Sequence, residues 1–253
     1  MADRDEIVSF CDELLDAASF DDYGPNGLQV PGRKEVTTVA TAVSAHRESI
    51  EASVDAGADL LLTHHGLFWD FHPRSLSPAM ASRLKLALAN DLSIAGYHLP
   101  LDAHPGIGNN VLLCRDLGFE PEAGAIGMVK GRGIGAIGRR EDGIGTGELV
   151  ARIRSLLGRE PLVFAEGPEA VSSIGIVSGA AASDIQTAIA LGLDAFLTGE
   201  PSEHVMADSR EGKINFIAAG HYATETCGIR RLGEAAAEQF GVRHVFIDVP
   251  NPI

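Results

Sequence analysis

Histidines and acidic residues gather at three places in the sequence, each directly after a short apolar run. Imidazole nitrogens and carboxylate oxygens bind divalent transition metals. Because ligands of open α/β sheets lie at the carboxyl ends of parallel strands, side chains from distant parts of the sequence can converge there. The three pairs are His64 and His65, His98 and Asp102, and His221 and Glu225. Together they predict one metal site assembled from distant segments.

The first two pairs can each bind a metal or play a plain structural role. On a regular strand, His64 and His65 would point to opposite faces. Where the strand bends into Gly66, they could reach two different metals. His98 and Asp102 flank a proline loop that can place both in one pocket, and His98 is a candidate for proton transfer. The alternatives are hydrogen-bonded structural histidines and a turn-capping aspartate.

The third pair favours a dinuclear site. His221 and Glu225 stand four residues apart at the start of a predicted long helix, which would place them on one face. A carboxylate can bridge two cations, so Glu225 is the natural bridging ligand; the alternative is an acidic residue that favours the helix dipole. Glu200, after another predicted strand, is a candidate for proton transfer, for orienting a histidine or for contacting substrate. Two metals ~3.5–4 Å apart bring the pKa of a shared water toward neutrality, so the set predicts metal-assisted hydrolysis.

The elements that must position these residues alternate between strand and helix. Apolar runs predict strands at residues 36–43, 59–63, 92–97, 161–165, 173–177, 194–197, 214–218 and 245–249. Helical spacing predicts helices at 5–18, 47–56, 78–88, 108–117, 146–157, 183–191, 203–210 and 224–240. This alternation predicts an α/β fold of mostly parallel sheets flanked by helices. We expect two like lobes, approximately residues 1–124 and 125–253, which could interlock, with the metal site in the cleft between them.

The glycine-rich segment from Gly124 to Gly147 interrupts the alternation. It predicts short antiparallel strands with a turn at Glu141–Gly143. Residues 133–138 match the G-x-G-x-x-G fingerprint of dinucleotide-binding sites, which requires a helix opening within the motif. Here a turn follows instead, so we interpret the motif as a glycine-rich strand.

Composition limits the class of protein and its partners. A chain of 253 residues with 45% apolar content is long enough for one large or two small α/β domains. The net charge of −15 disfavours nucleic acid as a partner. No apolar stretch approaches the ~18–20 residues that cross a bilayer, and the acidic N-terminus is unlike a signal peptide, so we expect a cytoplasmic protein. The cysteines Cys11, Cys114 and Cys227 are expected to be reduced and buried.

Five segments, in this order, resemble the Ngg-interacting-factor-three-like family, some of whose members are labelled GTP cyclohydrolase type-two homologues. They are residues 26–30, 62–66, 97–102, 194–200 and 219–225, and they span nearly the whole chain. The resemblance implies two like α/β lobes and a ring-shaped homohexamer with the metal sites facing an inner cavity. It also implies a dinuclear centre bound by His64, His65, Asp102, His221 and Glu225.

The resemblance and the ligand types together predict two divalent transition-metal ions, which could be Zn, Mn, Fe, Co or Ni, and a small-molecule substrate. The attacked bond could be in a purine ring, a phosphoester or an amide. The competing class is a non-catalytic metal carrier, sensor or interaction scaffold. One departure is that Leu99-Pro100-Leu101 stands where family members often have a Thr-Asn pair, so substrate contacts there are expected to differ.

Overall fold

The computed structural model describes all 253 residues, which form two compact units. Unit 1 comprises Met1–Leu101 and Gly228–Val249, and unit 2 comprises Asp102–Cys227 and Pro250–Ile253. The chain therefore leaves unit 1 and returns to it near its end. The boundary expected near residue 124 falls inside unit 2.

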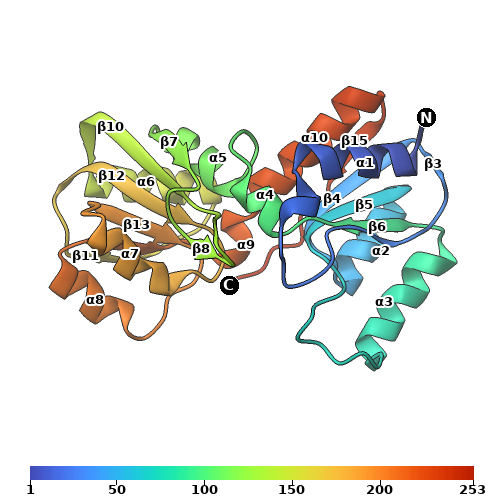
Figure 1. Ribbon diagram of the computed structural model, residues 1–253, viewed down its shortest axis with the longest axis horizontal. Coiled ribbons are helices and arrows are strands. Elements are labelled where there is room, and N and C mark those ends of the chain that lie inside the picture. Colours follow the sequence, from blue (N-terminus) through green and yellow to red (C-terminus); the bar gives the residue numbers. More distant parts are fainter. The chain divides into compact units, whose positions relative to one another are not determined.

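Unit 1 is built on a five-stranded sheet in the order β15-β4-β5-β6-β2. Only β2 is antiparallel to its neighbour. Figure 1 shows α1 and α10 on one face of this sheet and α2 and α3 on the other. The strands are β2 (Gly27–Val30), β4 (Thr38–Ser44), β5 (Leu60–His65), β6 (Ser93–Gly96) and β15 (Arg243–Phe246). The helices are α1 (Arg4–Leu14), α2 (Arg47–Asp55), α3 (Pro78–Ala89) and α10 (Thr226–Phe240). Because both faces are covered, Leu60, Leu61 and Leu62 are fully buried.

Unit 2 contains a six-stranded mixed sheet in the order β11-β14-β13-β12-β10-β7. The central strands β12, β13 and β14 are parallel, and the other three are antiparallel to their neighbours. The strands are β7 (Glu120–Ala123), β10 (Ala136–Gly145), β11 (Leu162–Ala165), β12 (Ala170–Val177), β13 (Ala195–Thr198) and β14 (Asn215–Ala218). Helices α5 (Asn109–Asp116) and α6 (Thr146–Leu157) contact β10, whereas α7 (Ile185–Ala190) contacts β13 and α8 (Val205–Gly212) contacts β14. Leu149 and Ile153 of α6 are buried in the core of this unit.

The two units share one chain order, because β4-α2-β5-α3-β6 corresponds to β12-α7-β13-α8-β14. An aspartate precedes the central strand in each. Asp59 Oδ2 accepts hydrogen bonds from the backbone N–H groups of Thr37 (2.8 Å) and Thr38 (3.1 Å) and from Thr37 Oγ1 (2.7 Å). Asp194 Oδ2 accepts from the backbone N–H (2.9 Å) and Oγ (3.0 Å) of Ser173. The predicted α/β class with mostly parallel sheets is confirmed.

Two local predictions near the ligands were wrong. The long helix predicted at 224–240 is present as α10, which begins at Thr226. His221 and Glu225 do not share it, because His221 lies in a separate short helix, α9 (His221–Thr224), and Glu225 has a non-helical conformation (φ −116°). The segment after His98 is a short helix, α4 (Leu99–Ala103), rather than a loop. Pro100 fits there because the first turn of a helix needs no backbone N–H donor.

The glycine-rich segment forms antiparallel strands as predicted, including the pair β8 (Met128–Val129) and β9 (Arg132–Gly133). The predicted turn at Glu141–Gly143 was wrong, because β10 continues through it with a register shift between Arg139 and Ile144. Such irregularities let a strand bend without ending. No helix begins within residues 133–138, so the strand interpretation of the glycine motif is confirmed.

The cysteines and the helices bear on the compartment in which the protein was expected to work. Burial raises the pKa values of the Cys11 and Cys114 thiols to about 12, while Cys227 is only half-buried, and none of the three forms a disulfide. None of the helices has the length and apolar character that spanning a membrane requires.

Asp59→Asn is expected to destabilise unit 1 by about 1–3 kcal/mol at neutral pH, because it weakens hydrogen bonds to a buried carboxylate. Burial works to raise the pKa of Asp59, but bonds from Thr37 and Thr38 and the charge of Arg33 hold it below its ordinary value. This stabilisation is therefore present above about pH 4 and is lost as the pH falls through the folded-state pKa. Guanidinium unfolding followed by fluorescence measures it, since the only tryptophan, Trp69, lies in unit 1.

The matched control is Asp55→Asn at the exposed end of α2, which should leave the unfolding midpoint unchanged. An Asp59→Asn midpoint equal to that of the wild type at pH 7 would contradict this role. A difference that persists undiminished in acid would contradict the charge argument.

Candidate metal centre

Three imidazoles gather at the carboxyl edge of the unit 1 sheet. His64 and His65 end β5, and His98 follows Gly96, the last residue of β6, by two positions. The ring centroids are 4.8 Å apart for His64 and His65, 5.1 Å for His64 and His98, and 5.6 Å for His65 and His98. One ligand nitrogen from each ring lies within 4.8 Å of the other two. This set can hold a divalent metal ion.

Gln29 packs against the chain where β5 ends. Leu67 donates its backbone N–H to Gln29 Oε1 (2.7 Å), and Gln29 Nε2 donates to the Pro25 carbonyl (2.8 Å). A Cβ on Gly66 would lie 2.2 Å from Gln29 Nε2, so a side chain there would displace this amide. β5 ends at His65, which lets two adjacent imidazoles approach each other.

His64, His65 and His98 are each hydrogen-bonded at Nδ1. A ring whose Nδ1 donates to a carbonyl or carboxylate carries its proton there, which leaves the Nε2 lone pair for a metal. The partners of His64 and His98 are pure acceptors of this kind, and the partner of His65 is a hydroxyl. They are the Tyr97 carbonyl for His64 (3.0 Å), Ser44 Oγ for His65 (3.0 Å) and Asp22 Oδ1 for His98 (2.8 Å). The residues present therefore fit a metal bound through Nε2.

Asp22 is a site residue that sequence reasoning missed. Its buried carboxylate accepts from His98 Nδ1, from the backbone N–H of Leu99 (2.9 Å) and from Asn26 Nδ2 (3.0 Å). Burial works to raise its pKa, but the bonds from His98, Asn26 and the backbone of Tyr23 hold that pKa below the ordinary value. Asn26 Oδ1 in turn accepts the His98 backbone N–H (3.0 Å). The pair fixes both the ring and the backbone of His98.

Unit 2 holds the other predicted ligands near the ends of β12 and β14. Asp102 and Glu225 are buried, and Glu225 Oε2 lies 3.3 Å from His221 Nε2. Asp102 Oδ1 accepts a hydrogen bond from Ser178 Oγ (3.2 Å), and the next residue, Gly179, faces Glu225. One turn after β12 therefore contacts both carboxylates.

His221 is oriented by Glu200, whose Oε1 is hydrogen-bonded to His221 Nδ1. Burial disfavours the charged ring, but Glu225 and Glu200 outweigh it and raise the pKa of His221 to about 9. A metal at Nε2 would take the place of the proton there. Glu200 stands to His221 as Asp22 stands to His98. Glu200 follows β13 by two residues, as the sequence predicted, and this position brings its carboxylate to the His221 ring.

The structure thus divides the predicted site residues between the units. His64, His65 and His98 form a close set in unit 1, and Asp102, Glu200, His221 and Glu225 lie together in unit 2. His98 and Asp102, predicted to share one loop, belong to different units. Each set offers nitrogen donors, oxygen donors or both, and neither contains a thiolate, which suits a transition metal in a site open to chemistry.

Comparisons with known proteins agree over the whole chain. A family model described as Duf34/NIF3 (NGG1p interacting factor 3) matches residues 2–252. A protein of Pseudomonas aeruginosa named GTP cyclohydrolase 1 type 2 homolog is 44% identical over 246 residues, covering 97% of each chain. The chain is also similar to the solved structure of protein ybgI, of unknown function (TM-score 0.92, 38% identity, 99% of this chain and 100% of that one). The structure of TTHA1606 from Thermus thermophilus is similar as well (TM-score 0.87, 33% identity, 99% and 100% coverage).

Gly179→Ala is expected to weaken metal binding about 10–100-fold, the range seen when support around metal ligands is lost. The added Cβ would lie 2.5 Å from Glu225 Oε1 and 3.3 Å from His221 Nε2. Calorimetric titration of the chelator-treated protein with Zn²⁺ or Mn²⁺ measures the loss. The control is Gly192→Ala, whose φ of +65° matches the +69° of Gly179 but whose Cβ would meet nothing within 4 Å. Equal affinities in the two variants would contradict the role of Gly179 in placing the ligands.

Proposed function

The chain belongs to the Duf34/NIF3 family, as its sequence segments predicted, and we propose that it is a dinuclear metal-dependent hydrolase of a nucleotide or another small molecule. The observation that carries the proposal is the hydrogen bonding of the ligands His64 and His221 at Nδ1 to a carbonyl and a carboxylate oxygen, which leaves Nε2 for a metal. The name GTP cyclohydrolase 1 type 2 homolog, carried by relatives, supports a purine nucleotide as one substrate class.

In this proposal the ligands of both units hold two divalent transition-metal ions, chosen from Zn, Mn, Fe, Co and Ni by donor type. The ligands are His64, His65, Asp102, His221 and Glu225. Glu225 would serve both ions, because its carboxylate offers two oxygens, one of which lies 3.3 Å from Nε2 of the ligand His221. When bound, such a metal pair supplies a water of near-neutral pKa for hydrolysis.

His98 and Glu200 have separate roles. Asp22 fixes the His98 ring and gives its protonated form an ionic partner at 2.8 Å, so His98 can accept a proton and pass it on. Glu200 orients His221 through Nδ1 and holds the ring for the metal. The family resemblance supports a homohexameric ring as the working form, and we propose that it works in the cytoplasm.

A non-catalytic metal carrier, sensor or scaffold would use the same ligands. Both proposals expect metal binding, but only the hydrolase is expected to turn over a substrate. Ligand substitutions alone therefore cannot choose between them, and both metal content and hydrolysis must be measured.

Protein purified without chelator is expected to contain about two transition-metal ions per chain by elemental analysis. Glu225→Gln should lose more metal than Asp102→Asn, because a bridging carboxylate serves both ions and a terminal one serves a single ion. A reproducible metal content near zero in the wild type would defeat the site. Equal losses in the two variants would remove the bridging role of Glu225.

The metal-loaded protein is expected to hydrolyse at least one member of a panel of nucleotides, phosphoesters and amides. His98→Gln should lower kcat about 10²–10⁴-fold, the usual contribution of a general acid or base, while the metal content stays near two. His204→Gln, an exposed histidine paired with Asp208, is the control and should keep full activity. Absence of turnover across the panel with both metals bound would favour the carrier or sensor class.

A further inference from the structure

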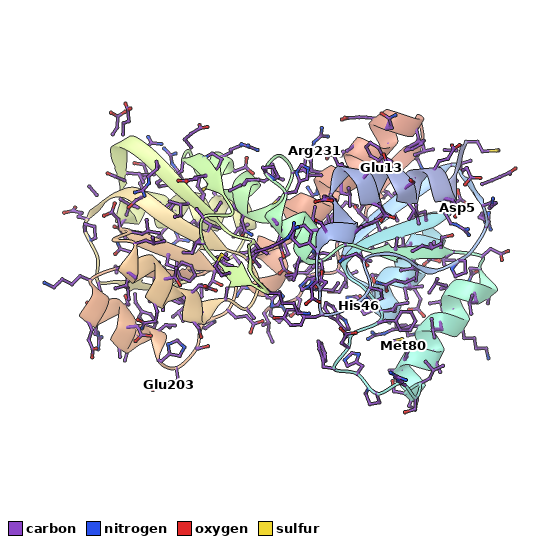
Figure 2. All side chains as sticks on the ribbon, in the orientation of Figure 1. Asp5, Glu13, His46, Met80, Glu203 and Arg231 are labelled. Atoms are coloured by element: carbon purple, nitrogen blue, oxygen red, sulfur yellow. The ribbon has the colours of Figure 1, made fainter.

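Unit 1 contains a cavity that the proposed metal chemistry does not use. It lies near the His64, His65 and His98 rings. It lies between the connection from β5 to α3, residues 66–77 (hereafter the 66–77 loop), and the first turns of α3. Its volume is about 640 Å³, within the ~300–1,000 Å³ typical of small-molecule sites. Met80 of α3, labelled in Figure 2, is one of its lining residues.

One wall of this loop cavity is aromatic. Phe68 and Trp69 line it, together with the apolar side chains of Leu67, Leu76 and Met80. Leu76, which directly precedes the N-cap residue Ser77 of α3, is 59% exposed. Phe71 stacks on the Trp69 ring at 5.6 Å, and a planar ligand ring would extend this stack or pack on Phe68, because aromatic faces attract one another beyond the burial of their area.

The loop cavity also has cationic lining residues. Arg74 and Arg83 both line it, with Asp70 as its only carboxylate. Neither arginine forms an ion pair or hydrogen bond within the chain, although the chain as a whole carries a net charge of −15. A guanidinium presents a planar set of donors that matches a phosphate or carboxylate. The N-terminus of α3, capped by Ser77, also faces this cavity and favours negative charge.

The loop cavity adjoins the imidazole set. Phe68 and Trp69 line both this cavity and a smaller hollow bounded by His64 and His98. The Trp69 ring lies 5.1 Å from the His98 ring and 5.9 Å from the His65 ring. Only the Trp69 ring would therefore separate a molecule in the loop cavity from the His65 and His98 rings.

We propose that the loop cavity binds the part of the substrate that does not react, and that the substrate is an aromatic anion, with its ring against Phe68 and Trp69 and its phosphate or carboxylate on Arg74 and Arg83. The assignment of the bound molecule as substrate rests on the proposed function. The binding site itself does not, because all its residues belong to unit 1 and none is a metal ligand.

The test is calorimetric titration of the full-length protein with GMP, which carries a ring and a phosphate, beside guanosine and ribose 5-phosphate, which each lack one. GMP is expected to bind saturably and at least about tenfold more tightly than either fragment, since each half of the site contributes. Arg74→Gln and Arg83→Gln should each weaken GMP binding about tenfold, the loss of a charge-assisted hydrogen bond. GMP should also change the fluorescence of Trp69, the only tryptophan.

The control variant is Arg210→Gln in unit 2, an exposed arginine paired with Glu166, which should bind GMP as the wild type does. Absence of saturable GMP binding, or unchanged binding in the Arg74→Gln/Arg83→Gln double variant, would overturn the proposal. Guanosine binding equal to GMP would remove the anion site, and ribose 5-phosphate binding equal to GMP would remove the ring site.

Each titration is repeated after chelation, with the metal content measured in the same samples. GMP binding that persists without metal supports an independent cavity, and loss of binding with the metal would overturn it. Absence of metal from the wild-type protein would defeat the hydrolase proposal and leave the cavity result intact, so the two failures are distinguishable.

Discussion

The site depends on one interaction, the hydrogen bond that holds each imidazole by its Nδ1 atom. A free histidine can bind a metal through either nitrogen and rotates freely, but a ring tied at Nδ1 offers only Nε2 and only in one direction. The acceptors differ in kind: a backbone carbonyl for His64, a hydroxyl for His65, and carboxylates for His98 and His221. The carbonyl and carboxylates fix the proton of their rings on Nδ1, whereas the Ser44 hydroxyl positions the His65 ring and can donate or accept. Much of the surrounding structure serves to place these acceptors.

The acceptors come from the same edge of the sheet as the ligands. Ser44 is paired with His65 across the adjacent ends of β4 and β5, and Glu200 follows the end of β13. In both units, central strands are positioned by an aspartate that accepts backbone hydrogen bonds from the neighbouring strand, Asp59 in one and Asp194 in the other. Because each unit repeats this order, a carboxyl edge suited to ligands arises twice, once with imidazoles alone and once with carboxylates and an imidazole.

The sequence predicted the strands that carry ligands because fully buried strands are written as unbroken apolar runs, as in Leu60–Leu62. It could not predict the partnership of Asp22 and His98, which are 76 positions apart and joined by no spacing rule. The non-helical conformation of Glu225 was equally invisible, because residues 224–240 have good helical spacing. The hydroxyl of Thr224 accepts a hydrogen bond from the Gly179 backbone N–H (3.3 Å) and donates to the Gly220 carbonyl (2.9 Å). Local patterns thus predicted where the ligands lie, while tertiary contacts decide how they are held.

The central claim is that both ligand sets bind metal through Nε2 and carboxylate oxygen. Crystals of the metal-loaded protein measured at the absorption edge of the bound metal test it directly through the anomalous difference map. The account predicts two peaks per chain, with Nε2 atoms of His64, His65 and His221 and oxygens of Asp102 and Glu225 at about 2.0–2.2 Å from them. Peaks coordinated by Nδ1 atoms, or metal bound only at other residues, would contradict it.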